Sequence, residues 1–192
     1  MRKVIVSMNI TLDGFMAGPN CELDWHFNYW NEEMAEYASY QLSHADTILL
    51  GRVTYNAMAK YWTAVTMSAV APRQDLAFAG MMNNYHKIVF SKTMEKAEWN
   101  NSRLVKNNIS KEIMQLKRQP GKDMIIYGSG SVVSTLMRSD LVDEYVLWIH
   151  PVVLGKGKNL FKSQHDMHAL RLIEVKSFSS GVIILSYEKL PD

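Results

Sequence analysis

The fold is decided by Ile125-Ile126-Tyr127-Gly128-Ser129-Gly130-Ser131-Val132, in which an apolar run leads directly into two glycines. A short apolar run such as Met124–Tyr127 is typical of a strand that is buried on both faces. The glycines let the backbone turn tightly and approach a ligand closely, and the helix that follows offers free N–H groups to a pyrophosphate. The third glycine of G-x-G-x-x-G is missing, because Val133 stands there, and so is the lysine of a P-loop. The motif alone therefore fits a phosphate cradle and a simple tight turn equally well.

A second junction of this kind is Leu49-Leu50-Gly51-Arg52-Val53-Thr54, where the short buried strand Thr47–Leu50 ends in a glycine at a helix start. Arg52 can pair with a phosphate bidentately and Thr54 can donate a further hydrogen bond, although a surface arginine on a first helical turn also explains the pattern. A third and weaker junction is Val89-Phe90-Ser91-Lys92-Thr93, a strand end with a hydroxyl and a cation. All three junctions are expected at the carboxyl ends of strands, where open α/β sheets bind ligands.

The rest of the chain alternates between strand-like and helix-like segments. The expected strands are Lys3–Ile10, Thr47–Leu50, Lys87–Ser91, Met124–Tyr127 and Tyr145–Ile149, and the loop Thr11–Asp24 follows the first of them. Helices are expected from Trp30 to Leu42 with Asn31 as a cap, after Gly51, after a cap at Ser110, and after Gly128-Ser129-Gly130-Ser131 through Met137. The segments Leu170–Ser177 and Val182–Leu190 predict a terminal hairpin. This order predicts one α/β domain over residues 1–192, with a mixed, mainly parallel sheet flanked by helices and a C-terminal antiparallel hairpin.

Composition excludes several classes of protein. The 192 residues are 47% hydrophobic and 21% charged, with a net charge of +2 and no run of basic residues, so nucleic acid is not an expected partner. No apolar run approaches the roughly 20 residues of a membrane span, and the N-terminus lacks the pattern of a signal peptide. We therefore expect a cytoplasmic protein that does not bind membranes.

Other kinds of site find little support. The one cysteine, Cys21, permits no internal disulfide and is interpreted as an incidental thiol in a turn. His165 and His168 are the only close pair of histidines and have no Cys or Glu partner in sequence, so no metal site is expected. There is no G-x-S-x-G motif of a serine hydrolase.

Taken in order, the segments of this chain resemble the dihydrofolate reductase superfamily, especially the branch related to the C-terminal reductase domain of the bifunctional riboflavin-biosynthesis deaminase-reductase. The matching pieces are Ile10–Pro19, Leu23–Trp25, Leu49–Tyr55, Phe90–Thr93, Gly128–Ser131, Leu141–Glu144, and Pro151–Gly157 before Leu160-Phe161. They span nearly the whole chain. None is specific alone, but seven in the right order are hard to obtain by chance.

This resemblance implies an NADPH-dependent reductase and assigns roles to residues by matching position. The cofactor pyrophosphate would be held by the backbone of Gly128, Ser129, Gly130, Ser131 and Val132. Phosphates would be held from the other side by Gly51, Arg52, Val53 and Thr54, with Arg52 near the 2′-phosphate that distinguishes NADPH from NADH. The adenosine end would be lined by Ser91 and Lys92, and the nicotinamide covered by Met16, Ala17, Gly18 and Trp25.

The substrate side matches the family less well. Dihydrofolate reductases use a carboxylate on the first helix, but Glu32, Glu33 and Glu36 fit a solvated helix face equally well. The riboflavin reductases lead us to expect an acidic residue ahead of the glycine motif and arginines for a ribose phosphate, whereas this chain has Ile126-Tyr127 and no matching arginine set. Asp13 is the candidate catalytic residue, orienting a substrate or a water, although it can equally stabilise its own turn.

The function expected first is hydride transfer from NADPH to a small heterocyclic acceptor, pterin-like or pyrimidine-like. One alternative is a 5-amino-6-(5-phosphoribosylamino)uracil reductase of riboflavin biosynthesis. Another is a non-catalytic nucleotide-binding or sensing module. A homodimer is also expected, because the strand Tyr145–Ile149, with Trp148, would put a large apolar surface into an edge.

Overall fold

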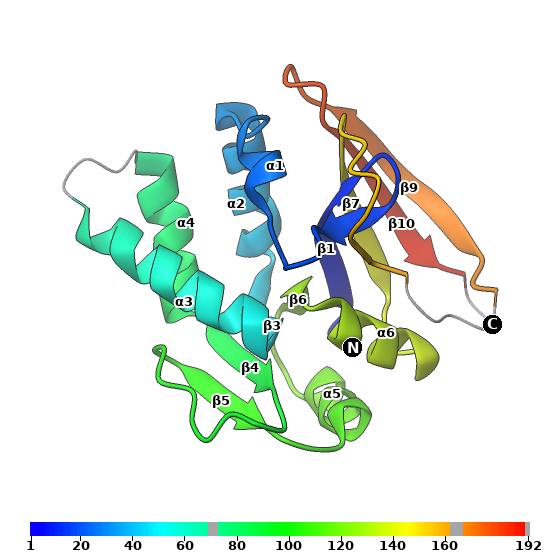
Figure 1. Cartoon of the computed structure of the whole chain (residues 1–192). Helices are drawn as coiled ribbons and strands as arrows, with labels where there is room; N and C mark the ends of the chain where they lie inside the picture. Colours follow the sequence, from blue (N-terminus) through cyan, green and yellow to red (C-terminus); the bar gives the residue numbers. More distant parts are fainter. Residues whose placement is uncertain (69–72, 162–166, 191–192) are drawn as a thin grey trace.

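The protein is built around a single large β-sheet, seen in a computed structural model that describes residues 1–68, 73–161 and 167–190. Eight strands lie in the order β5-β4-β3-β6-β1-β7-β10-β9 (Figure 1). Their bounds are β1 Val4–Thr11, β3 Ala45–Gly51, β4 His86–Phe90, β5 Ser102–Val105, β6 Asp123–Gly128, β7 Glu144–His150, β9 Leu170–Ser177 and β10 Ile183–Lys189. A small second sheet pairs β2 (Phe15–Ala17) with β8 (Lys158–Asn159).

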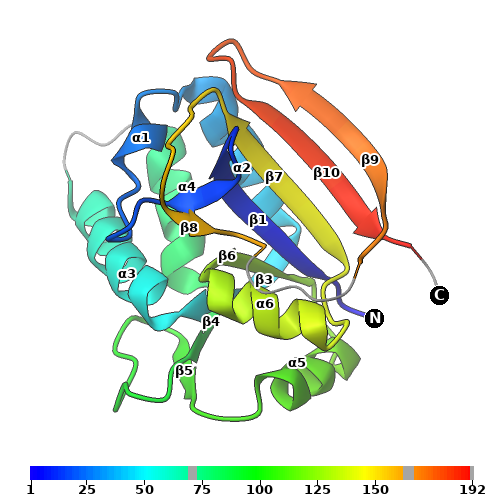
Figure 2. The same ribbon diagram turned by 45° about the vertical axis from the view of Figure 1, so that its right-hand side comes forward.

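The direction of the strands confirms the predicted mixed sheet. The pairs from β5 through to β7 are all parallel, whereas β10 pairs antiparallel with both β7 and β9. The parallel strands need crossover connections, and the helices supply them. The fold is therefore α/β with a C-terminal antiparallel hairpin, and Figure 2 shows β9 and β10 side by side beyond β7.

Helices cover both faces of the sheet. They are α1 Asp24–Phe27, α2 Glu32–Ser43, α3 Arg52–Met67, α4 Arg73–Asn84, α5 Ile109–Arg118 and α6 Gly130–Arg138. On one face, Leu42 of α2, Tyr55 of α3 and Met82 of α4 pack with strand residues such as Ile125. On the other face, residues of α5 and α6 pack against β1 and β6. Alternate residues of each central strand point to opposite cores, which explains the continuous apolar runs in the sequence.

Two local predictions are corrected by the structure. The cap position of α5 is Asn108, with φ +56°, rather than Ser110. Ser110 lies inside the first turn of the helix, and its hydroxyl is 2.6 Å from the Ser139 hydroxyl. The predicted loop Thr11–Asp24 contains β2 and leads into α1. The prediction of Asn31 as the cap of α2 is confirmed, because its side chain accepts a hydrogen bond from the Met34 N–H at 3.0 Å.

The apolar edge that we expected at Tyr145–Ile149 is wrong. That segment is β7, which lies inside the sheet between β1 and β10, and Trp148 is only 4% exposed. The outer strand is β9, where Leu172, Ile173 and Val175 are half exposed or more. The apolar edge is thus displaced by two strands, because the sequence does not show which strand is last in the sheet. No helix within the described ranges is long and apolar enough to cross a membrane.

Candidate functional site

The two glycine junctions meet at one point of the sheet. Strands β3 and β6 are neighbours, and Leu50 lies opposite Gly128 in their register. A Cβ atom added to Gly51 would clash with the Ser129 hydroxyl, and one added to Gly128 would lie 2.6 Å from the Thr54 Oγ1. Gly128 also has φ +134°, a conformation that side chains disfavour. Glycine is therefore required here by close approach and by backbone conformation, and the two segments form one surface.

The helices that begin at these junctions have open N-termini. Gly51 caps α3 and Ser129 caps α6, neither cap residue accepts a hydrogen bond from a first-turn N–H through its side chain, and neither first turn contains an acidic residue. The contrast is α2, which has both the Asn31 cap and Glu32 and Glu33 in its first turn. Unsatisfied N–H groups and a positive dipole end attract an anion. Two such ends at adjacent strands are suited to a group with two phosphates.

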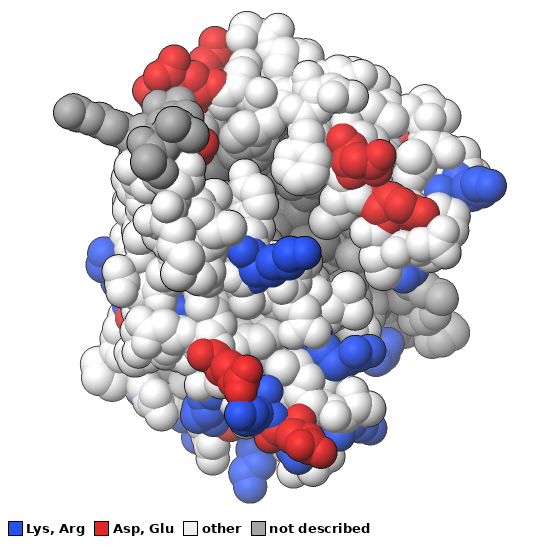
Figure 3. Space-filling view, turned by 60° about the vertical axis from the view of Figure 1, so that its left-hand side comes forward, with Lys and Arg blue, Asp and Glu red and all other residues white. Residues whose placement is uncertain are grey.

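Side chains around these N-termini add further donors. The hydroxyls of Ser129 and Ser131 are 2.8 Å apart, and Thr54 is half-buried beside Gly128. Arg52 is exposed and has no ion pair among residues 1–68, 73–161 and 167–190. On the side turned toward α3 and α4, Figure 3 shows a depression with basic side chains at its lower margin and acidic ones above it.

Val132 and Val53 differ from the other predicted phosphate-binding residues. The Val132 N–H donates to the Ser129 carbonyl at 3.0 Å, and its side chain is buried in the core. Val132 therefore anchors the start of α6, and the N–H groups left at the open turn belong to Gly130 and Ser131. The Val53 side chain is half exposed on the first turn of α3.

The predicted nicotinamide loop packs onto the start of α6. A Cβ atom on Gly130 would lie 2.8 Å from the Met16 Sδ, so β2 and the glycine motif are in close contact. Ala17 is buried, and a side chain on Gly157 would clash with its carbonyl oxygen. The Gly18 N–H donates to the Glu22 carbonyl at 2.9 Å. The structure thus brings Met16 to the phosphate-binding turn that the sequence predicted.

Ser91 and Lys92 follow β4, one strand further along the sheet from Gly51. The Ser91 hydroxyl accepts hydrogen bonds from the N–H groups of Met94, at 3.1 Å, and Thr93, at 3.3 Å. It therefore closes its own loop, whereas the Lys92 side chain is exposed. Both lie at the carboxyl edge of the sheet, beside the α3 junction.

Asp13 is held in a network that favours the turn-stabilising interpretation over a catalytic one. Its carboxylate accepts hydrogen bonds from the Thr11 hydroxyl at 2.6 Å, the Leu154 N–H at 3.1 Å and the Gly155 N–H at 2.7 Å. The Thr11 hydroxyl and these backbone donors lower the pKa of Asp13 to about 2. A carboxylate that stays ionised at neutral pH is a poor proton donor. Asp13 instead ties the end of β1 to the segment after β7.

A polar cluster that the sequence did not reveal lies at the carboxyl end of β7. His150 is fully buried, and its Nε2 is 2.9 Å from the Oδ1 of Asn9 on β1. Burial, with a smaller contribution from the neighbouring His26, lowers the pKa of His150 to about 4. The Trp25 ring packs edge-on against the imidazole. The signal was available in principle, because strand alternation puts His150 and Trp148 on the same face of β7.

The glutamates of α2 do not form part of this cluster. Glu33 accepts hydrogen bonds from the Ser179 N–H at 3.2 Å and from its hydroxyl at 3.0 Å, so it ties α2 to the β9–β10 turn. Glu32 and Glu36 are exposed. The aromatic rings beside His150 are instead those of Trp25 and His26 in α1 and of Tyr29, which follows that helix.

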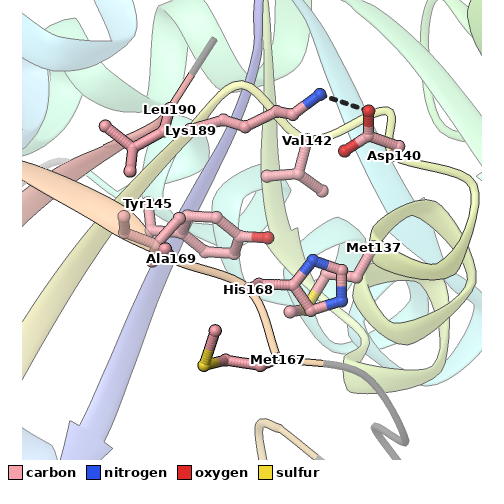
Figure 4. Close-up of a pocket in the computed structure, with 10 residues that line it drawn as sticks. Met137, Asp140, Val142, Tyr145, Met167, His168, Ala169, Lys189 and Leu190 are labelled. Atoms are coloured by element: carbon pink, nitrogen blue, oxygen red, sulfur yellow. Dashed lines mark hydrogen bonds and ion pairs between the residues drawn. The ribbon is translucent and has the colours of Figure 1, made fainter. Parts of the chain in front are cut away.

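A separate cavity of about 240 Å³ lies near the start of β7, at the opposite end of this strand from His150. Figure 4 shows its lining, with Tyr145 and Val142 inside and the ion pair between Lys189 and Asp140 at its margin. His168 lines this cavity, whereas His165 lies outside the described residues. No group of three potential metal ligands occurs in residues 1–68, 73–161 and 167–190.

Comparison with known proteins identifies the family. Residues 2–184 match the model of the RibD C-terminal domain family, and the chain belongs to that family. The uncharacterized protein YyaP of Bacillus subtilis (strain 168) is 34% identical over 186 residues, which cover 97% of this chain and 94% of YyaP.

Solved structures show the same fold at lower identity. A protein of Shewanella sp. PV-4 named for riboflavin biosynthesis superposes with a TM-score of 0.75 at 20% identity, covering 98% of this chain and 99% of that one. Dihydrofolate reductase from Enterococcus faecalis, solved in complex with NADP(H) and RAB-propyl, gives a TM-score of 0.62 at 13% identity, covering 97% of this chain and 96% of that one. The fold is therefore that of dihydrofolate reductase, as predicted.

Proposed function

We propose that this protein is an NADPH-dependent reductase that transfers a hydride to a C=N or C=O bond of a small pterin-like or pyrimidine-like heterocycle. The observation that carries the proposal is the contact between the two glycine junctions, which sets two uncapped helix N-termini side by side. Membership of the RibD C-terminal domain family supports a reductase. The fold shared with a dihydrofolate reductase solved with NADP(H) supports the choice of cofactor.

The residues of the site fit a phosphorylated dinucleotide. Three positions of this surface have no room for a Cβ atom, which would collide with a neighbouring side chain, so the backbone can approach closely there. They are Gly51, Gly128 and Gly130. The N–H groups of Gly130 and Ser131 and the two helix dipoles suit the pyrophosphate. Arg52, unpaired within the described residues, suits a 2′-phosphate.

In this proposal the protein promotes the reaction mainly by holding the cofactor and the acceptor in position. NADPH, when bound, supplies the hydride. The glycine surface orients the cofactor along the carboxyl edge of the sheet, and the segment Met16–Gly18 excludes water from the reacting atoms. Asp13 fixes the loops on either side and stays ionised. The acceptor binds beyond β1, on the side of β7.

The two alternatives give different results in a turnover assay. We would measure NADPH oxidation with a panel of reducible heterocycles, including the ribosylaminopyrimidine phosphate of the riboflavin pathway. Turnover with a non-phosphorylated ring supports the proposal. Turnover only with the phosphorylated pyrimidine supports the riboflavin reductase, which family membership favours and the missing arginines oppose. NADPH binding without oxidation in any mixture supports the non-catalytic module.

A further inference from the structure

Two buried nitrogen atoms that have no hydrogen-bond partner among the described residues lie in neighbouring side chains at the carboxyl end of β7. They are the Nδ1 of His150 and the Nε1 of Trp25. The two ring centroids are 5.2 Å apart, and the ring planes are nearly perpendicular, at 85°. Leaving a buried donor or acceptor unpaired is unfavourable, and native proteins rarely do so. Two such atoms in adjacent rings mark a place where a polar group of a ligand can bind.

The two nitrogen atoms have opposite hydrogen-bonding roles. The indole Nε1–H of Trp25 can only donate. The His150 Nε2 faces the Asn9 Oδ1 at 2.9 Å, and because a carbonyl oxygen only accepts, Nε2 carries the proton. Burial lowers the pKa of His150 to about 4, so the ring is neutral at pH 7 and its Nδ1 is an acceptor. An acceptor and a donor are therefore presented side by side.

The position of this pair suits an acceptor that meets the cofactor. His150 lies opposite Thr11 at the end of β1, and β1 lies between β7 and β6, the strand that ends at Gly128. The rings of Tyr29 and His26 are each centred 6.0 Å from the His150 ring. Aromatic rings of this kind form good walls for a flat ligand.

The helix α1 places the Trp25 ring against His150 and has few ties to the rest of the protein. It is one turn long, its cap residue Leu23 makes no side-chain hydrogen bond, and it contains no buried residue. Phe27 on its outer side is 58% exposed. Because both orphan atoms are buried and Trp25 belongs to α1, a ligand reaches them only when α1 moves outward with Trp25 and opens a space between the two rings, which its weak anchoring permits.

We propose that His150 and Trp25 bind the cis-amide edge of a flat, uncharged ring, with the ring N–H donating to His150 Nδ1 and the ring carbonyl accepting from Trp25 Nε1–H. The identification of that ring as the hydride acceptor rests on the proposed function. His150 and Trp25 then determine specificity for lactam-type heterocycles, and Asn9 is a positioning residue that fixes the tautomer of His150. A merely structural histidine would have both ring nitrogens satisfied.

The test uses uracil as a probe, with 1,3-dimethyluracil as the matched compound that lacks the N–H groups, and it omits NADPH. Binding is followed by NMR of the Trp25 indole N–H and the His150 ring nitrogens in the whole chain. We expect uracil to shift both signals and dimethyluracil to bind at least tenfold more weakly. Trp25→Phe keeps an aromatic ring and removes the N–H donor, so it should weaken uracil binding by about five- to tenfold. Trp30→Phe, at an exposed tryptophan that stacks on Trp148, is the control and should change nothing.

The inference is overturned if uracil does not bind, if dimethyluracil binds as tightly, or if uracil leaves the Trp25 and His150 signals unmoved. Its failure is distinguishable from failure of the proposed function. If Trp25→Phe oxidises NADPH with an unchanged KM for the acceptor, the proposed reductase activity is supported, but His150 and Trp25 do not bind its acceptor. If uracil binds at this pair but the protein binds no NADPH, the ring-binding site is supported and the proposed reductase activity is contradicted.

Discussion

Gly128 lies so close to Thr54 that a Cβ atom on the glycine would be 2.6 Å from the threonine Oγ1. The two residues belong to different strand–helix junctions, 74 positions apart in numbering (128 − 54), and their approach makes those junctions one surface. Because β3 and β6 are neighbouring parallel strands, the junctions at their carboxyl ends lie at the same edge of the sheet. The close approach of Gly128 and Thr54 therefore brings the two junctions together to form the candidate site.

The first prediction concerns the Gly128 backbone. Gly128→Ala should destabilise the protein by about 1–3 kcal/mol, because it forces a side chain into φ +134° and against Thr54. Gly80→Ala is the control, since Gly80 lies within α4 with no atom near its Cβ position. There alanine should stabilise by up to about 1 kcal/mol. Urea unfolding of both variants measures whether each substitution raises or lowers the free energy of unfolding. Equal changes in the two variants would contradict the special role of Gly128.

The second prediction concerns a buried lysine of β4 whose ammonium group meets the carbonyls at the C-terminal end of α4. The Lys87 ammonium donates to the carbonyls of Met82, at 2.8 Å, Asn83, at 3.1 Å, and Tyr85, at 2.8 Å, and it is fully buried. Lys87→Met keeps the aliphatic stem but leaves these carbonyls without their donor, so a loss of about 2–4 kcal/mol is expected. The exposed Lys111→Met should change the free energy of unfolding by less than about 0.5 kcal/mol. A Lys87→Met protein as stable as wild type would show that the carbonyls find other donors.

The third prediction follows from the pKa of His150. Burial holds it at about 4 in the folded protein, against an ordinary value of 6.5. The unfolded chain therefore takes up the proton first as the pH falls, and stability should decrease between pH 6.5 and 4. At pH 4.5 the loss attributable to His150 should be about 2–3 kcal/mol. The titratable side chains of His26 and Tyr29 face His150, and burial also lowers the pKa of His26.

His150→Gln removes this titration. Unfolding free energies measured in urea at pH 7 and pH 4.5 should differ less in the variant than in the wild-type protein. Asp13 affects stability at lower pH than His150 does. The folded pKa of Asp13 is about 2, so Asp13 lowers stability only below the ordinary aspartate pKa of 3.8. An unchanged difference in His150→Gln would show that other groups cause the acid sensitivity.

The homodimer stays a prediction, now with β9 in place of β7 as the apolar edge. Ile173 and Val175 are more than half exposed on this outer strand. Light scattering should give twice the chain mass, and Val175→Lys should shift the protein toward the monomer, because a charge on an edge strand opposes pairing. The control Val53→Lys, at an exposed valine on α3, should leave the mass unchanged.

Much of the fold could be predicted from the sequence because the information is local. Runs such as Met124–Tyr127 and Thr47–Leu50 are apolar since both faces of a parallel sheet are covered, and glycines mark where the chain turns. Strand order is not local, which is why β7 was mistaken for an edge. The same limit applies to the site. Gly51 and Gly128 were found as motifs, whereas the pairing of His150 with Asn9 depends on which strands are neighbours.

The most direct test of the central claim is a titration of the purified protein with NADPH and with NADH, in wild type and Arg52→Ala. Lys60→Ala, which removes an exposed positive charge further along the same helix, is the control. Tryptophan fluorescence reports binding. We expect the wild type and Lys60→Ala to bind NADPH more tightly than NADH by about tenfold or more, and Arg52→Ala to lose this preference while still binding NADH. If neither nucleotide binds the wild-type protein, the glycine surface is not a dinucleotide site.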